Sequence, residues 1–513
     1  MTLAGISAVR ISTGILIVSG ALSGHAQEPA GKQEWLPASP AKLPCWRGFN
    51  LLEKFHLSRG KKPFLESDFR MMSELGFNFV RLPMDYRTWI RDGDWTTFDE
   101  EALREIDQAV EWGEQYGIHV MINFHRAPGY CVNKRPPEPA SVWEDAETQR
   151  VCALHWATFA KRYRGIPNER VSFNLFNEPN KVEAETYLGV VEMLTDAIRA
   201  EDPDRLIISD SFFGDSSALG KGLKRLNVAF SPHQYWPGRV THYKASWVKG
   251  SDQYPVPTWP MMSCSGRLFS PTKKGYPPGP LTLSGPFTRT TQLRLKMGRV
   301  SARALVVIRA DDREIWRKDF VPGPGEGEWE KVVFAEQWNI HQNIYNRDYT
   351  CEIPAGAEVV TVAMEAGDWC VLSEAGLTRP GQTEDVLPLS NEWNVRAGVA
   401  TYTPGGPRGA FAGQKTIGAD AIRDHMTSWR GVKAHGVGVF IGECGVFNKT
   451  PHDVSLRWLE DSMRLLKEQG WGWALWNFRG SFGILDSGRE DVEYESYQGH
   501  KLDRKMLDIL LRY

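Results

Sequence analysis

From residue 45 onward, short apolar runs alternate along the chain with segments of helical period. Several runs are apolar at nearly every position, as in Val-Met-Ile-Asn-Phe and Val-Ser-Phe-Asn-Leu-Phe, which is typical of strands covered on both faces of a parallel sheet. The predicted strands are Trp46–Leu51, Asn78–Pro83, His119–Phe124, Val171–Asn177, Leu206–Ser209, Val228–His233, Val439–Gly442 and Gly472–Asn477. Eight strands with helices between them favour an α/β fold of the closed (β/α)8, or TIM-barrel, type.

The segments between the strands have the apolar spacing of amphipathic helices. In residues 100–117, Leu103, Ile106 and Val110 share one face, and Gly117 can end the helix. Residues 455–470 repeat leucine and methionine at spacings of three and four. A doubly wound open sheet is the alternative, but no Gly-rich phosphate loop follows the first predicted strand.

The helical period disappears from about residue 256 to 410, where Pro and Gly clusters separate short alternating stretches. β-rich runs recur there at Ala304–Ile308, Glu314–Phe320, Lys331–Phe334 and Val359–Met364. This spacing predicts an all-β sandwich, resembling a carbohydrate-binding module in outline, inserted after the sixth barrel strand. Barrel geometry then places the insert on the face of the βα loops, beside the mouth of the active site. The barrel itself is predicted to comprise residues 27–255 and 411–513.

Residues 1–26 have the pattern of a secretory signal peptide. Arg10 precedes an apolar core at Ile11–Leu22, and small residues surround a cleavage point after Ala26. An uncleaved membrane anchor is the alternative, although the core is short for a bilayer span. We therefore expect a secreted or periplasmic protein with no membrane span in the mature chain.

Charge and cysteine usage exclude several classes of partner. The 513 residues carry 61 basic and 63 acidic side chains, so nothing favours nucleic acid or an anionic membrane. None of the seven cysteines lies in a CxxC pair, and no metal or cofactor is predicted. In an oxidising compartment, Cys351 with Cys370 is the first expected disulfide, and Cys444 is the expected free thiol. Oligomeric state stays open.

Polar and aromatic side chains lie at six of the predicted strand ends, where a (β/α)8 barrel carries its functional groups. Glu178 and Glu443 follow strands four and seven, so they face each other across the opening. Glycosidic cleavage uses such a carboxylate pair, with retention at a separation of about 5 Å and inversion at roughly 6.5–9.5 Å. The whole candidate set is Arg81, His125, Asn177, Glu178, His233, Tyr235, Glu443 and Trp476.

Six short motifs occur in order at these positions. They are Arg81-Leu-Pro, His125-Arg-Ala-Pro-Gly, Asn177-Glu178-Pro, His233-Gln-Tyr235, Gly442-Glu443 and Trp476. Each motif alone is weak, but together they resemble glycoside hydrolase family 5 of clan A over residues 45–255 and 411–513.

The resemblance implies a role for each matching residue. Glu178 would be the acid/base, and Asn177 would donate to the sugar 2-hydroxyl. Glu443 would be the nucleophile. Arg81 would keep Glu443 ionised by lowering its pKa, and Tyr235 would donate a hydrogen bond to it.

The remaining positions complete the implied site. His125 and His233 would bind and polarise it, with His233 near Glu178, and Trp476 would be the stacking floor under the sugar. The alternatives are structural: Arg81 as a salt bridge, the histidines as buried imidazoles and Trp476 as core, since Trp471 and Trp473 are close in sequence.

The tryptophans of the insert allow two interpretations. They could form a carbohydrate-binding platform, but packing in the sandwich core is expected for most of them. They are Trp316, Trp329, Trp338 and Trp369.

The predicted function is retaining hydrolysis of a β-1,4-linked polysaccharide through a covalent glycosyl-enzyme, of the endo-β-1,4-glucanase type. The alternatives are a β-mannanase, another β-glycan hydrolase or a transglycosylase using the same site. A non-catalytic carbohydrate-binding barrel is a further alternative, but such proteins are expected to lose a carboxylate, and both Glu178 and Glu443 are present. Endo or exo action is not determined by these motifs.

Overall fold

The computed structural model describes residues 35–59, 62–133, 136–212, 216–254, 256–262, 264–273, 276, 279–391, 397–406, 410–413 and 416–513. The predicted signal peptide at residues 1–26 lies outside these described residues. Secretion therefore stays a prediction. Among the described residues, no helix combines the length and the apolar composition that crossing a bilayer requires.

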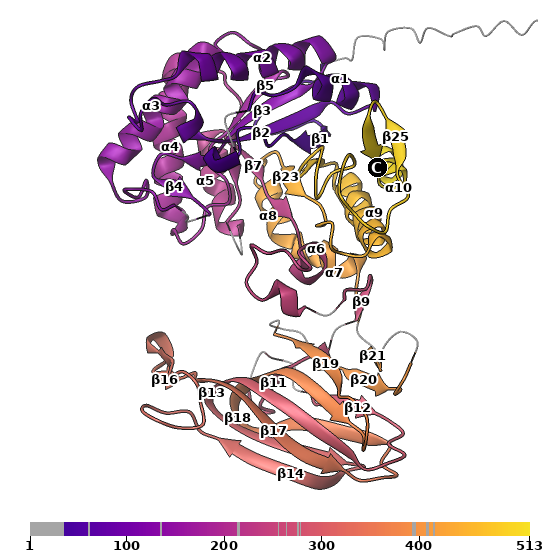
Figure 1. The fold of residues 1–513 in the computed structure, drawn as a ribbon. Coiled ribbons are helices and arrows are strands. Elements are labelled where there is room, and N and C mark those ends of the chain that lie inside the picture. Colours follow the sequence, from indigo (N-terminus) through magenta and orange to yellow (C-terminus); the bar gives the residue numbers. More distant parts are fainter. Residues whose placement is uncertain are drawn as a thin grey trace, which may run out of the picture.

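Parallel strands form the first sheet, and they close into the predicted barrel (Figure 1). The barrel strands are β1 (Arg47–Asn50), β2 (Phe79–Asp85), β3 (His119–Ala127), β5 (Val171–Asn174), β6 (Ile207–Asp210), β7 (Ala229–Ser231), β8 (His233–Gln234), β23 (Phe440–Cys444) and β24 (Gly472–Leu475). β7 and β8 together occupy the sixth position. The ring closes because β1 pairs with β24 and β23 pairs with β8, both in parallel. The predicted (β/α)8 fold is confirmed.

Helices cover the outside of the barrel, as Figure 1 shows. They are α1 (Glu66–Glu74), α2 (Glu100–Tyr116), α3 (Ala146–Arg162), α4 (Ala184–Glu201), α5 (Gly220–Leu226), α6 (Gly238–Thr241), α7 (Ala419–His425), α8 (Thr427–Ala434), α9 (His452–Gln469) and α10 (Arg504–Arg512). In α2, Asp99 caps the N-terminus and Gly117, at φ 68°, ends the helix. Its predicted apolar face, Leu103, Ile106 and Val110, is buried against the strands.

Several short elements complete the barrel. The 3-10 helices are η1 (Leu57–Arg59), η2 (Tyr86–Thr88), η3 (Ser217–Leu219) and η4 (Ser251–Gln253). The short strands are β4 (Tyr130–Cys131), which extends β3 as a hairpin, and the pair β25 (Glu495–Tyr497) and β26 (His500–Leu502).

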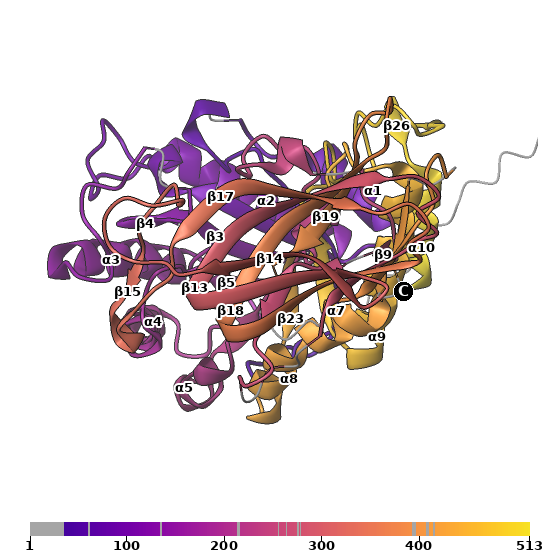
Figure 2. The same cartoon turned by 90° about the horizontal axis from the view of Figure 1, so that it is seen from below.

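The insert is a second, β-rich unit with its own apolar core. Its elements are β9 (Met261–Met262), β10 (Cys264–Ser265), β11 (Arg267–Phe269), β12 (Leu281–Ser284), β13 (Thr291–Ala310), β14 (Arg313–Phe320), β15 (Phe334–Ala335), η5 (Glu336–Trp338), β16 (Ile340–His341), β17 (Ile344–Ile353), β18 (Val359–Thr378), β19 (Asp385–Ser390), β20 (Val399–Tyr402), β21 (Phe411–Gly413) and β22 (Thr416–Ile417). The two 20-residue strands, β13 and β18, pair antiparallel along their length with several bulges. Figure 2 shows these long strands crossing the view in front of the barrel.

The insert follows the sixth barrel position, as predicted, and lies on the side of α6 and α7 (Figure 1). β9 pairs with β22, so the segments that leave and re-enter the barrel run side by side. Arg239 of α6 also donates a hydrogen bond to the carbonyl of Leu389, at 3.4 Å. That the insert borders the active-site mouth stays a prediction, as do the exact domain boundaries.

The predicted Cys351–Cys370 disulfide is wrong. Both cysteines are free, and they lie on β17 and β18, the two strands that flank β13 on opposite sides. Cys351 is opposite Leu293 and Cys370 is opposite Val300, so the two thiols are separated by a strand and by several residues of register. A disulfide needs a Cα separation of about 4.4–6.8 Å, which this arrangement does not offer.

The tryptophans separate into buried and exposed positions. Trp471 and Trp473 belong to the barrel core, and Trp369 is buried in the insert. Trp316 and Trp329 pack against the core of the insert, as expected for most of its tryptophans. Trp338, the fourth tryptophan of the insert, lies in η5 and is 61% exposed.

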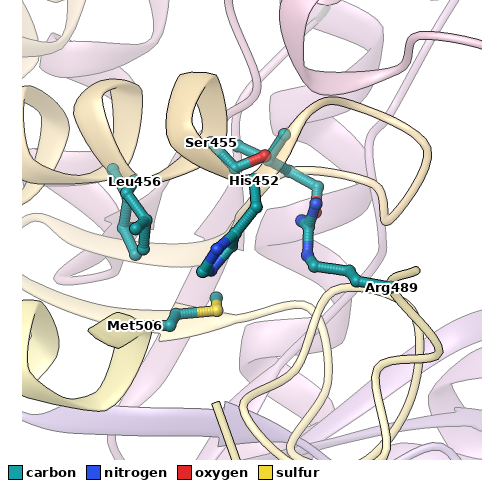
Figure 3. Close-up of a pocket in the computed structure, with 7 residues that line it drawn as sticks. His452, Ser455, Leu456, Arg489 and Met506 are labelled. Carbon is teal, nitrogen blue, oxygen red and sulfur yellow. The ribbon is translucent and has the colours of Figure 1, made fainter. Parts of the chain in front are cut away.

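A small cavity lies between α9, α10 and Arg489 of the loop after β24 (Figure 3). Its volume is about 10 Å³, which suits one water molecule and excludes a sugar. His452, which lines the cavity, forms a hydrogen bond of 2.7 Å with Asp503. Arg489 donates to the carbonyls of Thr450 and Val446. We interpret this cavity as part of the structural packing.

Candidate active site

Two carboxylates and one imidazole meet at the carboxyl ends of the barrel strands. Glu443 lies in β23, His233 in β8, and Glu178 follows β5 by four residues. Their side-chain N and O atoms come within 4.8 Å of one another. The structure thus brings the two predicted carboxylates together on one rim, as the strand positions indicated.

Arg81 organises the floor of this site. It was expected at a strand end, but it is the third residue of β2, which continues to Asp85. Its buried guanidinium donates to Glu443 Oε1 at 2.7 Å and to Asn177 Oδ1 at 2.9 Å. It also donates to Asn50 Oδ1 at 3.1 Å, so one cation fixes groups from three other strand positions.

Glu443 is buried and has a donor on each oxygen. Arg81 occupies Oε1, and the hydroxyl of Tyr235 donates to Oε2 at 3.1 Å. Burial raises the pKa of Glu443 above its ordinary value, although His233 and Arg81 act against burial. Arg81 therefore lowers the pKa of Glu443, as expected, but burial raises it by more, and the net shift is upward. Burial and the Glu443 charge also raise the pKa of Tyr235 well above its ordinary value, so this phenol remains a donor.

His233 lies among three carboxylates. Its Nδ1 is 2.9 Å from Glu178 Oε1 and 3.6 Å from Glu443 Oε2, and its Nε2 is 3.2 Å from Asp210 Oδ2. Burial alone would lower the pKa of His233, but Glu443, Asp210 and Glu178 raise it to about 10. The protonated ring has no free lone pair to offer a metal ion, and it can donate from Nδ1 toward Glu178 and from Nε2 toward Asp210.

The backbone at Glu178 is held in an unusual conformation. Its φ is 49°, in the left-handed region that side chains other than Gly rarely adopt. Tyr130 donates to the carbonyl of Glu178 at 2.6 Å, and Asp210 Oδ2 accepts from its amide at 3.1 Å. These two bonds hold the strained residue, and its side chain stays 23% exposed, so a ligand can reach it.

Asn177 and His125 present polar atoms without a partner in the described part of the chain. Because Asn177 Oδ1 accepts from Arg81, the amide nitrogen Nδ2 is left as a donor. Burial, followed by the charges of Arg81 and His233, lowers the pKa of His125 well below its ordinary value. His125 is therefore a neutral imidazole, and its Nδ1 has no partner among these residues.

Trp476 follows β24 and is partly exposed, unlike its core neighbours. Its ring contacts Phe55 at a centroid distance of 5.2 Å and His125 at 5.6 Å. This position, beside the site histidine, suits a stacking surface.

Two residues of the site were missed by the sequence analysis. Asp210 ends β6 and contacts His233, Arg81 and the amide of Glu178. Asn50 ends β1 and accepts from Arg81. The signal was available, since strands one and five also end in polar residues, and the strand-end rule applies to them equally.

Aromatic rings extend outward from Tyr235. Phe482 lies 6.1 Å from Tyr235 and 6.2 Å from Trp247, by ring centroids. Phe447 packs edge-on against Trp247 at 4.8 Å, and Trp247 is 58% exposed. A supported, exposed indole therefore lies at the outer end of this row.

Comparisons with known proteins agree with this geometry. The family model described as Cellulase (glycosyl hydrolase family 5) matches residues 45–259. Endoglucanase C of Acetivibrio thermocellus is 29% identical over 193 residues, covering 37% of this chain and 55% of the relative. The chain thus spans about half the length of the curated relatives that it matches.

Solved structures share the fold. A structure described as a glycoside hydrolase is 26% identical, with a TM-score of 0.58, and the match covers 91% of this chain and 98% of that one. Thermotoga maritima Cel5A, in complex with mannotriose, has 15% identity and a TM-score of 0.50, with 91% and 97% covered.

The fold, the geometry of the site and the family match all show that the barrel is similar to glycoside hydrolases. Within that class, the resemblance to glycoside hydrolase family 5 is confirmed, with the family match on residues 45–259.

Proposed function

We propose that this protein is a secreted retaining β-glycosidase that hydrolyses a β-1,4-linked polysaccharide, acting as an endo-β-1,4-glucanase. The observation that carries the proposal is the approach of Glu178 and Glu443 oxygens to within 4.8 Å. Direct attack by a carboxylate uses a separation of about 5 Å, whereas inversion needs roughly 6.5–9.5 Å for an intervening water. The name of the endoglucanase relative supports the choice of a β-glucan.

The first step is attack by Glu443 on the anomeric carbon. Arg81 and Tyr235 hold its two oxygens by hydrogen bonds, at 2.7 and 3.1 Å, so the carboxylate is oriented before the sugar arrives. Glu178 donates its proton to the leaving oxygen, and the bond from Glu443 to the sugar replaces the glycosidic bond.

The second step reverses these roles. Glu178 takes a proton from a water molecule, which attacks the anomeric carbon and releases Glu443 as a carboxylate. Forming the glycosyl ester removes the charge of Glu443 from the neighbourhood of His233. His233 Nδ1 then keeps Glu178 Oε1, at 2.9 Å, as its nearest carboxylate, which orients Glu178 for the second step.

The other residues bind the sugar that is cleaved. The unpartnered Nδ2 of Asn177 supports its role as donor to the 2-hydroxyl. The neutral ring of His125 can bind a further hydroxyl, and the partly exposed face of Trp476 can stack on the sugar ring.

The experiment that tests this proposal is incubation with β-glucans, mannans and xylans while the anomeric proton is followed by NMR. We expect the β-anomer to form first from a β-1,4-glucan, with internal cleavage giving a rapid fall in viscosity. A first-formed α-anomer would overturn retention. Cleavage of mannan alone would overturn the glucanase assignment while leaving the mechanism in place.

Secretion is part of the proposal and rests on the sequence of residues 1–26. Expression with that segment, followed by N-terminal sequencing of exported protein, is expected to give a chain that begins at Gln27. Retention of the intact chain inside the cell would contradict it.

A further inference from the structure

A buried polar cluster lies beneath the loop that follows β3. Arg126 is 1% exposed, and its guanidinium donates to Glu138 Oε1 and to the carbonyl of Asn133, the latter at 2.9 Å. The hydroxyl of Tyr86 donates to Glu138 Oε2 at 2.8 Å, and the Glu138 side chain is 8% exposed. We call Tyr86, Arg126 and Glu138 the Glu138 cluster. The proposed reaction gives none of these three side chains a role.

The Glu138 cluster also holds the turn that precedes Tyr130. Glu138 Oε2 accepts from the amide of Gly129 at 3.3 Å, and the carbonyl of Gly129 accepts from the amide of Val142 at 3.1 Å. Gly129 has a φ of 82°, and a Cβ there would meet the Val142 nitrogen at 2.7 Å, so another residue would strain this turn. After the turn, Tyr130 pairs with Ala127 in the hairpin of β3 and β4. The cluster therefore fixes the backbone from which the Tyr130 side chain extends.

Tyr130 reaches from this hairpin to the backbone of Glu178. Its ring is buried and packs against Trp143 and Phe176, at centroid distances of 5.0 and 6.0 Å. Burial, followed by the charge of Glu178, raises the pKa of Tyr130 above its ordinary value, so the hydroxyl remains a donor. That hydroxyl donates to the carbonyl of Glu178 at 2.6 Å. A rigid, buried ring therefore joins the loop after β3 to the proposed acid/base.

The hydrogen bond from Tyr130 acts where the backbone departs from ordinary geometry. The amide of Glu178 donates to Asp210 Oδ2 at 3.1 Å, and its carbonyl accepts from Tyr130, so the peptide groups on both sides of its Cα are held. With φ at 49°, this backbone directs the carboxyl so that Oε1 lies 2.9 Å from His233 Nδ1. A residue in the left-handed region keeps that conformation only where the surrounding structure holds it. Loss of the Tyr130 hydroxyl removes one of two restraints on the direction of the Glu178 side chain.

We propose that the Tyr130 hydroxyl, placed by the Glu138 cluster, positions Glu178 and aims its carboxyl at the leaving oxygen of the glycosidic bond. This inference rests on the proposed function and deepens it, because it gives the loop after β3 a part in proton transfer. Tyr130 bonds the backbone of Glu178 and not its carboxyl, so it acts through Glu178 as a positioning residue.

The test compares Tyr130→Phe, which removes only the hydroxyl, with Tyr163→Phe as the matched control. Tyr163 is also buried, and its hydroxyl donates to Asp107 Oδ1 at 3.0 Å, between α2 and the end of α3 on the outside of the barrel. The substrates differ in their need for an acid. The leaving alcohol of a β-1,4-gluco-oligosaccharide needs the proton of Glu178, whereas the leaving group of 2,4-dinitrophenyl β-cellobioside departs without one.

In Tyr130→Phe we expect kcat/KM on the oligosaccharide to fall roughly tenfold to hundredfold, the cost of a misplaced catalytic group. On the dinitrophenyl substrate, kcat/KM should change little, because it reports the first step, which does not use the acid there. Glu138→Gln should give the same pattern at smaller size, because the amide keeps one acceptor oxygen. Tyr163→Phe is expected to lose stability while keeping the wild-type ratio of the two rates. Equal losses on both substrates, or no loss on either, would overturn the inference.

A crystal structure of Tyr130→Phe decides the inference independently of activity. We expect a changed φ at Glu178 or a longer distance from its Oε1 to His233 Nδ1, whereas Tyr163→Phe should keep 49° and 2.9 Å. Unchanged geometry in Tyr130→Phe would contradict the positioning role, even where the rates fall. If wild type cleaves neither substrate, the proposed function fails, and the same crystal structure still decides whether Tyr130 positions Glu178.

Discussion

Five ionisable side chains meet at the centre of the site, and the contacts among them set how each behaves. Arg81 and His233 are the cations, and Glu178, Asp210 and Glu443 are the acids. Burial disfavours every charge, and the close pairs compensate for that cost. Removing one member therefore changes the protonation of the others, which gives separable predictions.

Asp210 is expected to act as a positioning residue. Asp210→Asn removes a charge that raises the pKa of His233, and it weakens the acceptor for the amide of Glu178. We expect kcat to fall roughly tenfold to hundredfold with little change in KM, because the variant disturbs the acid/base and not the sugar contacts. The alkaline limb of the pH profile should also move to lower pH.

The control is Asp202→Asn, which removes another buried aspartate, paired with Arg205 at 2.7 Å away from the site. That variant should lose stability with no movement of the pH profile. If Asp210→Asn and Asp202→Asn give the same pH profile, Asp210 is not a positioning residue.

The protonation of His233 gives a prediction for how the free energy of unfolding depends on pH. Its pKa of about 10 in the folded protein lies above the ordinary value of 6.5, so its stabilisation is complete below pH 6.5 and is lost as pH rises through 10. Between these values, unfolding releases one proton, and stability falls by at most about 1.4 kcal/mol per pH unit.

Denaturant unfolding of wild type and His233→Gln between about pH 6.5 and 10 checks this slope. We expect the slope to flatten in His233→Gln. In His425→Gln it should persist, because burial lowers the pKa of His425 to about 4 and that ring is neutral throughout. A wild-type slope that survives in His233→Gln would contradict the assigned protonation.

At the scale of elements, the aromatic row from Tyr235 to Trp247 gives a prediction about polymer binding. Trp247 is 58% exposed and is supported by Phe447 and Phe482, so it offers a fixed flat surface. Trp247→Ala is expected to raise KM for soluble polysaccharide several-fold with kcat nearly constant. Trp338→Ala removes an indole of similar exposure from the insert and should leave the kinetics of soluble substrate unchanged. Equal effects of the two variants would contradict a binding surface at Trp247.

The strands of the barrel were predictable because they are covered on both faces, which leaves nearly continuous apolar runs. Their ends were less predictable. β2 extends to Asp85, which moved Arg81 from the expected end to the middle of the strand, and β5 stops at Asn174, before the bend at Glu178. A bend with φ of 49° depends on tertiary bonds from Tyr130 and Asp210, which no local pattern encodes.

The insert was predictable as β-rich but not in detail. The run predicted at Ala304–Ile308 is only part of β13, because bulges, such as the one between Ser301 and Ala304, shift the register without ending the strand. The predicted disulfide between Cys351 and Cys370 was wrong because sequence spacing does not show that β13 lies between their two strands.

At the scale of the whole molecule, a closed barrel explains why distant residues could be grouped from the sequence. Parallel strands end on one face, so Arg81, Glu178 and Glu443 converge although up to 362 residues separate them in the sequence. The charge balance could not be derived this way. It depends on distances such as 3.2 Å from His233 to Asp210, and these follow from how the strands tilt and pack.

The central claim is that Glu443 forms a bond to the sugar while Glu178 moves the proton. The most direct measurement is to treat the enzyme with an activated 2-deoxy-2-fluoro-β-glucoside or cellobioside and to map the adduct by peptide mass spectrometry. We expect one equivalent of sugar on the peptide that contains Glu443, and no adduct in Glu443→Gln. Label on a different carboxylate, or an active enzyme that stays unlabelled and releases the α-anomer, would contradict the account.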